Sequence, residues 1–154
     1  MKPRIFIAMA SGILGGPGKG LVQFLRHGGL DACQPVIINY ATAPEQDTEF
    51  TRAFQDVGAK VFSIRQNCAL DFGMIRQGLA IARSERCDIL QSHGYKSHVL
   101  CAAIHFLTKI PWIAFVHGWT SEDFKVRCYH TLEKCLVPAA TRVVAVSESL
   151  KLRL

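Results

Sequence analysis

The chain has 154 residues, 49% of them hydrophobic and 19% charged, so it is long enough to bury one core and a single domain is expected. Its formal net charge of +6 fits a partner that carries phosphate, such as a nucleotide, a nucleic acid or an anionic membrane. No apolar run reaches the roughly 18 residues of a membrane-spanning helix. No Lys/Arg tract or aromatic RNA-binding motif is present, so nucleic acid is not expected as a partner.

The first part of the chain alternates short apolar runs with glycines and a helical pattern. Apolar runs at residues 4–10 and 35–40 predict two buried strands, and the glycine-rich stretch 11–20 predicts a loop that leads into a helix. We expect Gly28-Gly29 to end this helix. The face of the helix that is predicted to be buried carries Leu21, Phe24 and Leu25.

The middle of the chain predicts two further helix–strand units. A helix over 47–57 ends at Gly58 and is followed by a strand at 60–64. Asp71 then predicts the N-cap of a helix that leads to a strand at 88–92. The stripe of this helix that is predicted to be buried carries Phe72, Ile75, Leu79 and Ala82.

The last third continues the same alternation. Apolar residues between 99 and 107 mark a largely buried helix, and residues 111–116 predict the fifth strand. Thr120 or Ser121 can cap a helix that precedes a sixth strand at 142–146, and Ser147 can cap a final helix.

Strands that alternate with helices in this way are typical of βαβ units, whose right-handed crossovers build a parallel sheet. The predicted fold class is therefore a Rossmann-like α/β sandwich of three layers. In such sheets ligands bind beyond the carboxyl ends of the strands. We expect the segments 11–20, 93–97 and 117–121 to border one crevice.

The glycine-rich stretch is the first candidate for a binding site. Gly15 and Gly16 would let backbone N–H groups approach a phosphate, and Lys19 would add a positive charge. The stretch is not a phosphate-binding P-loop, since Ile13 stands where that motif needs glycine and Gly20 where it needs Ser or Thr. It also lacks the Gly-x-Gly-x-x-Gly pattern of dinucleotide-binding proteins. The alternative is a flexible connector.

Two His-Gly pairs follow predicted strands and are the second candidate. His117 ends the fifth strand, where its side chain could hydrogen-bond a sugar hydroxyl or a phosphate, and Gly118 leaves room for a ligand. His93 stands in the same relation to the fourth strand. The alternative is that these histidines have a structural role only.

The spacing of cysteines and histidines disfavours a metal site. The six cysteines include no Cys-x-x-Cys pair. His93 and His98 are five positions apart, and His98 and His105 are seven apart, neither of which resembles His-Glu-x-x-His. We expect reduced thiols in a cytoplasmic protein without a bound metal.

Taken in order, three of these features resemble the N-terminal domain of family 4 glycosyltransferases, which have the GT-B fold. They are Gly15-Gly16 after the first strand, the Phe-Val-His-Gly segment that contains His117, and the strand-then-serine segment at residues 142–149. The resemblance spans almost the whole chain. It implies an acceptor-side domain over residues 1–154, whereas the donor-binding C-terminal domain and its Glu-x7-Glu motif are not in the sequence.

The resemblance also implies a mechanism. Gly15 and Gly16 would approach the donor phosphates or the acceptor, and His117 would contact the donor sugar near the reacting carbon. Most members of the family retain the anomeric configuration and need no metal. Pro17-Gly18-Lys19 departs from the acidic or bulkier residues that usually follow the two glycines.

Two functions remain open from the sequence. The first is one half of a glycosyltransferase that uses a nucleotide-sugar donor and a lipid-linked or polysaccharide acceptor. The second is a stand-alone Rossmann-like module that binds a nucleotide or a protein without chemistry. Peripheral contact with an anionic membrane at the inner face of the cell membrane is a further expectation, carried by the helices near 21–26 and 122–136, for which ordinary amphipathic core helices are the alternative.

Overall fold

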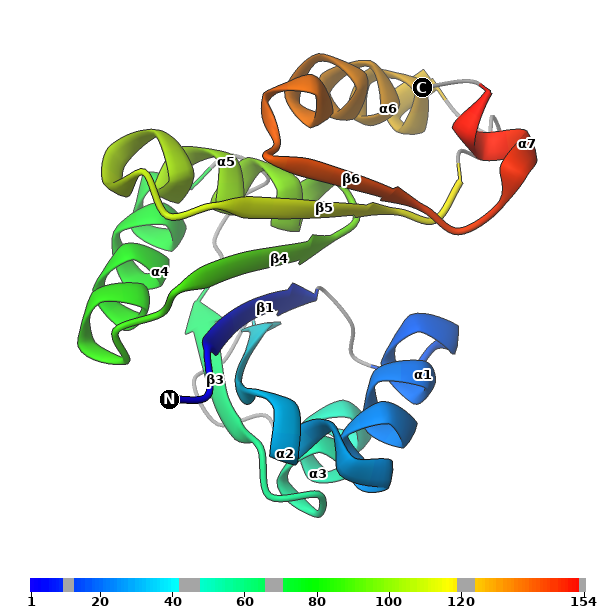
Figure 1. Cartoon of the computed structure of the whole chain (residues 1–154). Coiled ribbons are helices and arrows are strands. Elements are labelled where there is room, and N and C mark those ends of the chain that lie inside the picture. Colours follow the sequence, from blue (N-terminus) through cyan, green and yellow to red (C-terminus); the bar gives the residue numbers. More distant parts are fainter. Residues whose placement is uncertain (10–12, 42–47, 66–70, 119–123, 153–154) are drawn as a thin grey trace.

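The structure is a computed structural model that describes residues 1–9, 13–41, 48–65, 71–118 and 124–152, with the side chains of 124–129 excepted. Six parallel strands form one sheet in the order β3-β2-β1-β4-β5-β6 (Figure 1). The strands are β1 (Arg4–Met9), β2 (Gln34–Ala41), β3 (Lys60–Arg65), β4 (Ile89–His93), β5 (Trp112–Val116) and β6 (Arg142–Ala145).

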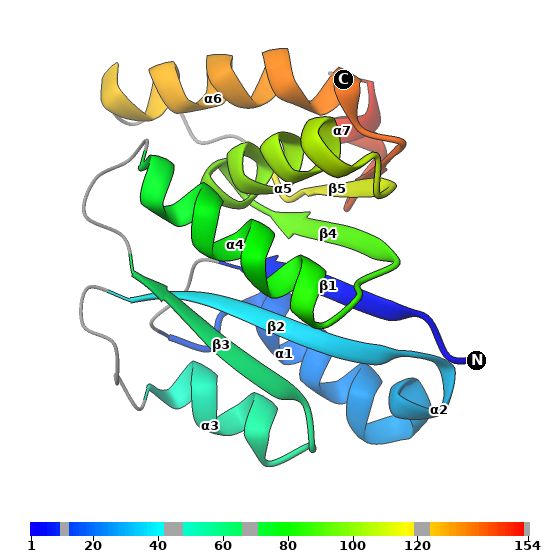
Figure 2. The ribbon, with the colours of Figure 1, turned by 90° about the vertical axis from the view of Figure 1, so that its left-hand side faces the viewer.

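Helices cover both faces of the sheet, so the predicted Rossmann-like three-layer architecture is confirmed. Figure 2 shows α4 and α5 on one face, α1 and α3 on the other, and α6 outside α5. The helices are α1 (Gly16–Phe24), α2 (Leu30–Ala32), α3 (Glu49–Gln55), α4 (Phe72–Ser84), α5 (Tyr95–Thr108), α6 (Phe124–Leu136) and α7 (Glu148–Lys151). A kinked segment, η1 (Leu25–Gly29), follows α1; the backbone leaves helical geometry at His27 and Gly28, where Gly28 has φ +103°. A 3₁₀ turn, η2 (Val137–Ala139), follows α6.

Strand β1 shows why apolar runs without polar alternation form this sheet. Phe6 and Ala8 pack into a core with α4 and α5, whereas Ile7 and Met9 pack into a second core with α1 and α3. Successive side chains of a strand point to opposite faces, so a strand covered on both faces must be apolar throughout. The six predicted strands are all confirmed to within a few residues, and β1 and β2 in particular were recognisable for this reason.

The predicted helices needed two corrections. Helix α1 begins at Gly16 inside the predicted loop, because Gly15 serves as N-cap and Pro17 fits the first turn, where its missing N–H costs nothing. The buried stripe of α1 also differs in part from the predicted one: Leu25 is buried as predicted and Val22 is buried beside it, but Phe24 is 52% exposed.

The second correction concerns α4. Ala82 is buried as predicted, and Ile75 and Leu79 are partly buried against the same core, but Phe72 is the first residue of the helix and is 87% exposed. Met74 and Gly78 are the buried residues that the prediction left out. Asp71 caps the helix as predicted, because its side chain accepts a hydrogen bond of 2.7 Å from the Gly73 N–H.

Two expectations lie outside the described residues: the first two positions of the 11–20 loop, and the helix cap at Thr120 or Ser121. Within the described parts of the chain, every helix is too short or too polar to cross a membrane.

Candidate functional site

The two strand-end histidines meet at the carboxyl edge of the sheet. His93 is the last residue of β4, and His117 directly follows β5, the neighbouring strand. The His93 Nδ1 lies 2.8 Å from the His117 Nε2, which is a hydrogen-bond distance. His93 is partly buried and His117 is exposed, so the pair presents one imidazole to solvent and holds it with the other.

The register of β4 and β5 creates this contact. His93 pairs with Phe115, so His117 lies two residues farther along β5 and points to the same face. The Phe115 and His93 rings lie 4.8 Å apart between centroids at an interplanar angle of 23°. The His93 and His117 rings differ by only 18°, with centroids 5.1 Å apart. Since their nearest nitrogens are 2.8 Å apart, we interpret these two rings as lying side by side in nearly one plane.

Gln91 completes the row on this face of β4. Its Nε2 lies 2.7 Å from the Nε2 of His93. Gln91 and His93 are two residues apart on one strand, which places them on the same face, and they pair with Ile7 and Met9 of β1 on the side covered by α1. Gln91 was not predicted from the sequence, in which only its position two residues before His93 could have indicated a role.

Both histidines are held in the neutral form at pH 7. Burial lowers the pKa of His93 from 6.5 to about 3, and the neighbouring His117 and His98 lower it further. Burial and His98 also lower the pKa of His117, and Glu133 opposes this. A neutral imidazole has one N–H donor and one acceptor nitrogen, so this pair suits polar ligands such as hydroxyls rather than acting as a fixed positive charge.

A glycine follows each histidine and leaves space at the edge of the sheet. Gly94 has φ +78° and Gly118 has φ +116°, conformations that other residues adopt only with strain. A Cβ atom placed on either glycine would have no neighbour within 4 Å among the described residues. The chain can therefore turn sharply here without filling the space beside the imidazoles.

The glycine-rich candidate lies at the start of α1. Gly15 and Gly16 are exposed, and a Cβ on either would meet no atom of the described residues within 4 Å. The N–H groups of Gly16 and Gly18 belong to the unpaired first turn of α1, whereas Pro17 has no N–H. Lys19 is exposed and lies on α1 instead of in a loop. Among the described residues no hydrogen bond connects this segment to the histidine pair.

The opposite face of β4 carries a buried polar network that the sequence analysis missed. The Ser92 Oγ accepts from the Trp112 indole N–H at 2.7 Å and lies 2.7 Å from the His98 Nδ1. Ser92, His98 and Trp112 are fully buried between the sheet and α5. The His98 Nε2 lies 2.9 Å from a carboxylate oxygen of Glu133 on α6, although this contact is not aligned as a hydrogen bond. The network therefore ties α5 and α6 to the centre of the sheet.

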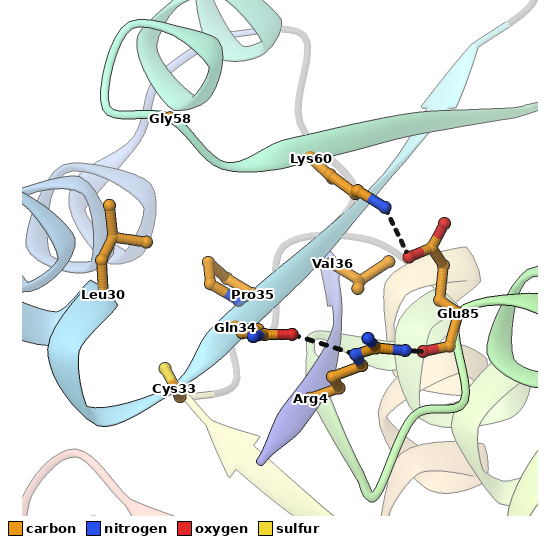
Figure 3. Close-up of a pocket in the computed structure, with 9 residues that line it drawn as sticks. All are labelled: Arg4, Leu30, Cys33, Gln34, Pro35, Val36, Gly58, Lys60 and Glu85. Carbon is orange, nitrogen blue, oxygen red and sulfur yellow. Dashed lines mark hydrogen bonds and ion pairs between the residues drawn. The ribbon is translucent and has the colours of Figure 1, made fainter. Parts of the chain in front are cut away.

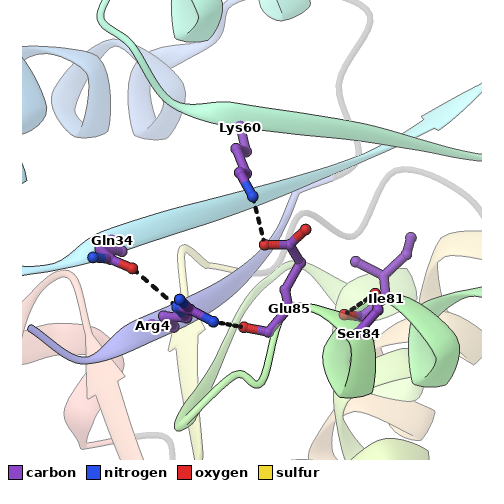
Figure 4. Close-up of polar contacts among 6 residues, drawn as sticks. All are labelled: Arg4, Gln34, Lys60, Ile81, Ser84 and Glu85. Atoms are coloured by element: carbon purple, nitrogen blue, oxygen red, sulfur yellow. Dashed lines mark hydrogen bonds and ion pairs between the residues drawn. The ribbon is translucent and has the colours of Figure 1, made fainter.

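A pocket of about 220 Å³ lies at the other edge of the sheet, where β1, β2 and β3 begin (Figure 3). The Arg4 guanidinium donates to the Gln34 side-chain oxygen and to the Glu85 carbonyl, both at 2.9 Å. Lys60 pairs with the Glu85 carboxylate at 2.9 Å (Figure 4). These polar groups already satisfy one another, so we interpret the pocket as a structural junction of three strand ends and the turn after α4.

Metal-ligating side chains do not gather in the described parts of the chain: no group of three or more His, Cys, Asp or Glu is placed to hold an ion. The polar groups that meet at the carboxyl edge are those of Gln91, His93 and His117.

Comparison with known proteins identifies the type of fold and the family. The sequence profile described as Glycosyltransferase Family 4 matches residues 14–154. No curated protein sequence matches the chain significantly.

Similar solved structures include the Anabaena protein HepE in complex with UDP (18% identity, TM-score 0.75, 97% of this chain and 38% of that one). A glycosyltransferase from Rickettsia africae (15%, TM-score 0.71, 99% and 39%) and the lipopolysaccharide outer core galactosyltransferase WaaB (14%, TM-score 0.67, 99% and 41%) are also similar. The fold is thus one Rossmann-like half of a GT-B architecture. The chain spans about two fifths of the length of these structures.

Proposed function

This chain belongs to glycosyltransferase family 4, and we propose that it forms the N-terminal, acceptor-side domain of a retaining glycosyltransferase. The donor would be a nucleotide-sugar, and the acceptor would be a lipid-linked sugar or a polysaccharide. Since the chain covers only 38% of the HepE structure, the groups that bind most of the donor would lie outside it. Alone, the chain would bind its acceptor but would not transfer a sugar.

The observation that carries the proposal is the exposed His117 imidazole at the carboxyl edge of the sheet, held by His93 and bordered by Gly118. A neutral imidazole that is fixed on one side can hydrogen-bond a hydroxyl of the donor sugar beside the reacting carbon. Orientation of this kind lowers the barrier because the sugar is held near its reactive geometry.

Charge that develops on the departing diphosphate would be stabilised electrostatically. The N–H groups of Gly16 and Gly18 and the side chain of Lys19 lie in the first turns of α1, where the helix dipole favours an anion. Gly15 leaves the approach open on the side of the described residues, none of which a Cβ there would contact within 4 Å. The proposed reaction uses these groups and involves no metal ion.

A binding titration of the purified chain tests this function. We would measure thermal stability and heats of binding with UDP, GDP, UDP-glucose, an oligosaccharide panel and a short-chain polyprenyl-diphosphate sugar. UDP and UDP-glucose are included because HepE structures contain them. A ligand that binds only the folded chain raises its stability with ligand concentration. Binding of an acceptor together with weak binding of nucleotides is the expected result.

Two histidine variants make the titration specific. His117→Ala should weaken acceptor or UDP-glucose binding, whereas His27→Ala should not, because His27 is exposed on η1 and its hydrogen-bond partner there is the Gln23 carbonyl. Equal binding by both variants would remove His117 from the site. Firm binding of a nucleotide alone, with no acceptor bound, would instead favour a stand-alone nucleotide-binding module.

We also propose that the domain works in the cytoplasm and touches an anionic membrane from its inner face. The exposed surface of α1 and η1 carries both an apolar residue, Phe24, and the basic residues Lys19 and Arg26. Co-sedimentation with phosphatidylglycerol vesicles should exceed that with phosphatidylcholine vesicles and should fall in Phe24→Ser. Equal sedimentation with both lipids would refute membrane contact.

A further inference from the structure

Three side chains stand in one hydrogen-bonded row on the α1 side of the sheet. Gln91 Nε2 lies 2.7 Å from His93 Nε2, and His93 Nδ1 lies 2.8 Å from His117 Nε2. Each ring therefore uses one nitrogen toward its inner neighbour, and the Nδ1 of His117 is the ring nitrogen at the end of the row. The exposed fraction increases along the row, since Gln91 and His93 are partly buried and His117 is exposed.

The side-chain amide of Gln91 determines which atom donates and which accepts in each hydrogen bond of the row. A glutamine amide nitrogen carries two hydrogens and can only donate. The His93 Nε2 must then accept and carry no hydrogen. A neutral imidazole has one N–H, so the hydrogen of His93 lies on Nδ1, which is the nitrogen that faces His117.

The same reasoning applies to the second ring. The His93 Nδ1–H donates to the His117 Nε2, which must be the bare nitrogen of His117. The single hydrogen of neutral His117 is then on Nδ1. The hydrogen bond made by one ring nitrogen determines the state of the other, which is how proteins generally select a histidine tautomer.

Both rings are neutral at pH 7, as this argument requires. Burial is the main reason that the pKa of His93 falls to about 3, and the pKa of His117 is lowered in the same direction. Were His117 charged, both of its nitrogens would donate, and its Nε2–H would oppose the His93 Nδ1–H across 2.8 Å.

We propose that Gln91 is a positioning residue, which acts through His93 to fix His117 in the tautomer that presents Nδ1–H to the ligand. His117 is then a hydrogen-bond donor at the carboxyl edge of the sheet. The ligand atom that it recognises is an acceptor, such as a sugar hydroxyl oxygen or a phosphoryl oxygen, and a hydroxyl in this place donates its own hydrogen elsewhere. The ligand assignment rests on the proposed function, whereas the tautomer follows from the hydrogen-bond geometry of two neutral rings.

The tautomers can be measured directly by NMR. Long-range ¹H–¹⁵N correlation spectra of the uniformly ¹⁵N-labelled chain distinguish protonated from bare imidazole nitrogens, and His93→Asn and His117→Asn identify the two sets of peaks. At pH 7.5 we expect the hydrogen on Nδ1 in both rings. Hydrogen on Nε2 in both rings would mean that the amide oxygen of Gln91 faces His93, and it would overturn the proposal.

A near-isosteric variant gives a second, sharper test. Gln91→Glu replaces the donor by a carboxylate, which can only accept, so His93 should move its hydrogen to Nε2 and accept at Nδ1 from His117. Both tautomers should reverse in the spectrum, measured at pH 8.5 to keep the rings neutral. Unchanged tautomers in Gln91→Glu would show that Gln91 does not control them.

The control is Gln77→Glu. Gln77 is a second glutamine with a hydrogen-bonded amide, but it lies on α4, on the opposite side of the sheet. Its amide nitrogen donates to the Arg65 and Gly73 carbonyls. Its replacement should leave both tautomers as they are. Since the measurement needs neither substrate nor turnover, failure of the tautomer proposal and failure of the glycosyltransferase proposal are separate results.

Discussion

The buried network around Ser92 leads to a quantitative prediction for Ser92→Ala. The Ser92 Oγ is the partner of both the Trp112 indole N–H and the His98 Nδ1, each at 2.7 Å, and all three side chains are fully buried. Alanine leaves both ring nitrogens without this partner. A buried polar group that loses its partner costs about 1–3 kcal/mol, so two groups give a loss of roughly 2–6 kcal/mol in the free energy of unfolding. This is a large part of the 5–15 kcal/mol or so of a typical domain.

Ser97→Ala is the matched control for this variant. Ser97 is also a fully buried serine, on α5, but its recorded side-chain partner is the Tyr40 hydroxyl at the long distance of 3.4 Å. The substitution removes the same atom from an equally buried position and should cost no more than about 1 kcal/mol. The difference between the two variants therefore isolates the bonds to Trp112 and His98.

Equilibrium urea unfolding, followed by far-UV circular dichroism and Trp fluorescence, measures both losses. The dependence of the unfolding free energy on urea concentration should be similar in the unsubstituted chain and in both variants, so that differences in the urea midpoints report differences in stability. A Ser92→Ala loss no greater than that of Ser97→Ala would refute the reasoning. The hydrogen bonds of Ser92 would then contribute little to the free energy of unfolding.

Three further predictions use the same assay. Gly118→Ala should lower the free energy of unfolding by about 1–3 kcal/mol, because φ +116° strains a residue with a side chain. The control Gly20→Ala, an equally uncrowded substitution inside α1, should raise the free energy of unfolding by up to about 1 kcal/mol. Equal effects of the two variants would contradict the argument from φ. The folded-state pKa of His93, about 3, lies below its ordinary 6.5, so the unfolded chain binds the proton more readily and stability should fall as pH decreases from 6.5 toward 3. This fall in stability should be smaller in His93→Gln. An identical pH profile in the two proteins would argue against a neutral buried ring. Lys60→Met should cost less than about 1 kcal/mol, because Lys60 is 67% exposed in its pair with Glu85, and a larger loss would show that the junction is a major source of stability.

The strands and the sheet class could be predicted from the sequence because a parallel sheet that is covered on both faces needs continuous apolar runs. Helix orientation was harder to predict. In α1 the predicted face consisted of Leu21, Phe24 and Leu25; Leu25 is buried as predicted, but Val22 lies in the core and Phe24 does not. A rotation of one residue about the helix axis is enough to move a large side chain into solvent.

The location of the candidate site could be predicted from the sequence, but the contact between His93 and His117 could not. The sequence put His93 and His117 at the ends of two strands, and the parallel sheet brings those ends to one edge. Their 2.8 Å contact also needs β4 beside β5 and the pairing of His93 with Phe115. A shift of one residue in this register would turn His117 to the opposite face, and no sequence pattern specifies the register to that accuracy.

His98 was missed for a related reason. From the sequence it was considered only as a metal ligand, and its spacing to His93 and His105 did not fit one. In the structure α5 carries it onto the face of β4 that holds Ser92, away from His93. Because α5 is apolar around much of its circumference and buried on several sides, its sequence does not reveal which residues point to the sheet.

Successive side chains of β4 point to opposite faces of the sheet, so residues expected to matter for stability and residues of the candidate site lie on different faces. Ser92 points to the α5 face and belongs to the buried network, whereas Gln91 and His93 point to the α1 face and hold His117. The two faces should therefore respond independently. Ser92→Ala should lower the urea midpoint without changing the tautomers of His93 and His117, and Gln91→Glu should reverse the tautomers at a smaller cost in stability. If Ser92→Ala also changed the tautomers, the backbone of β4 would have to couple the two faces, and the row from Gln91 to His117 would not act alone.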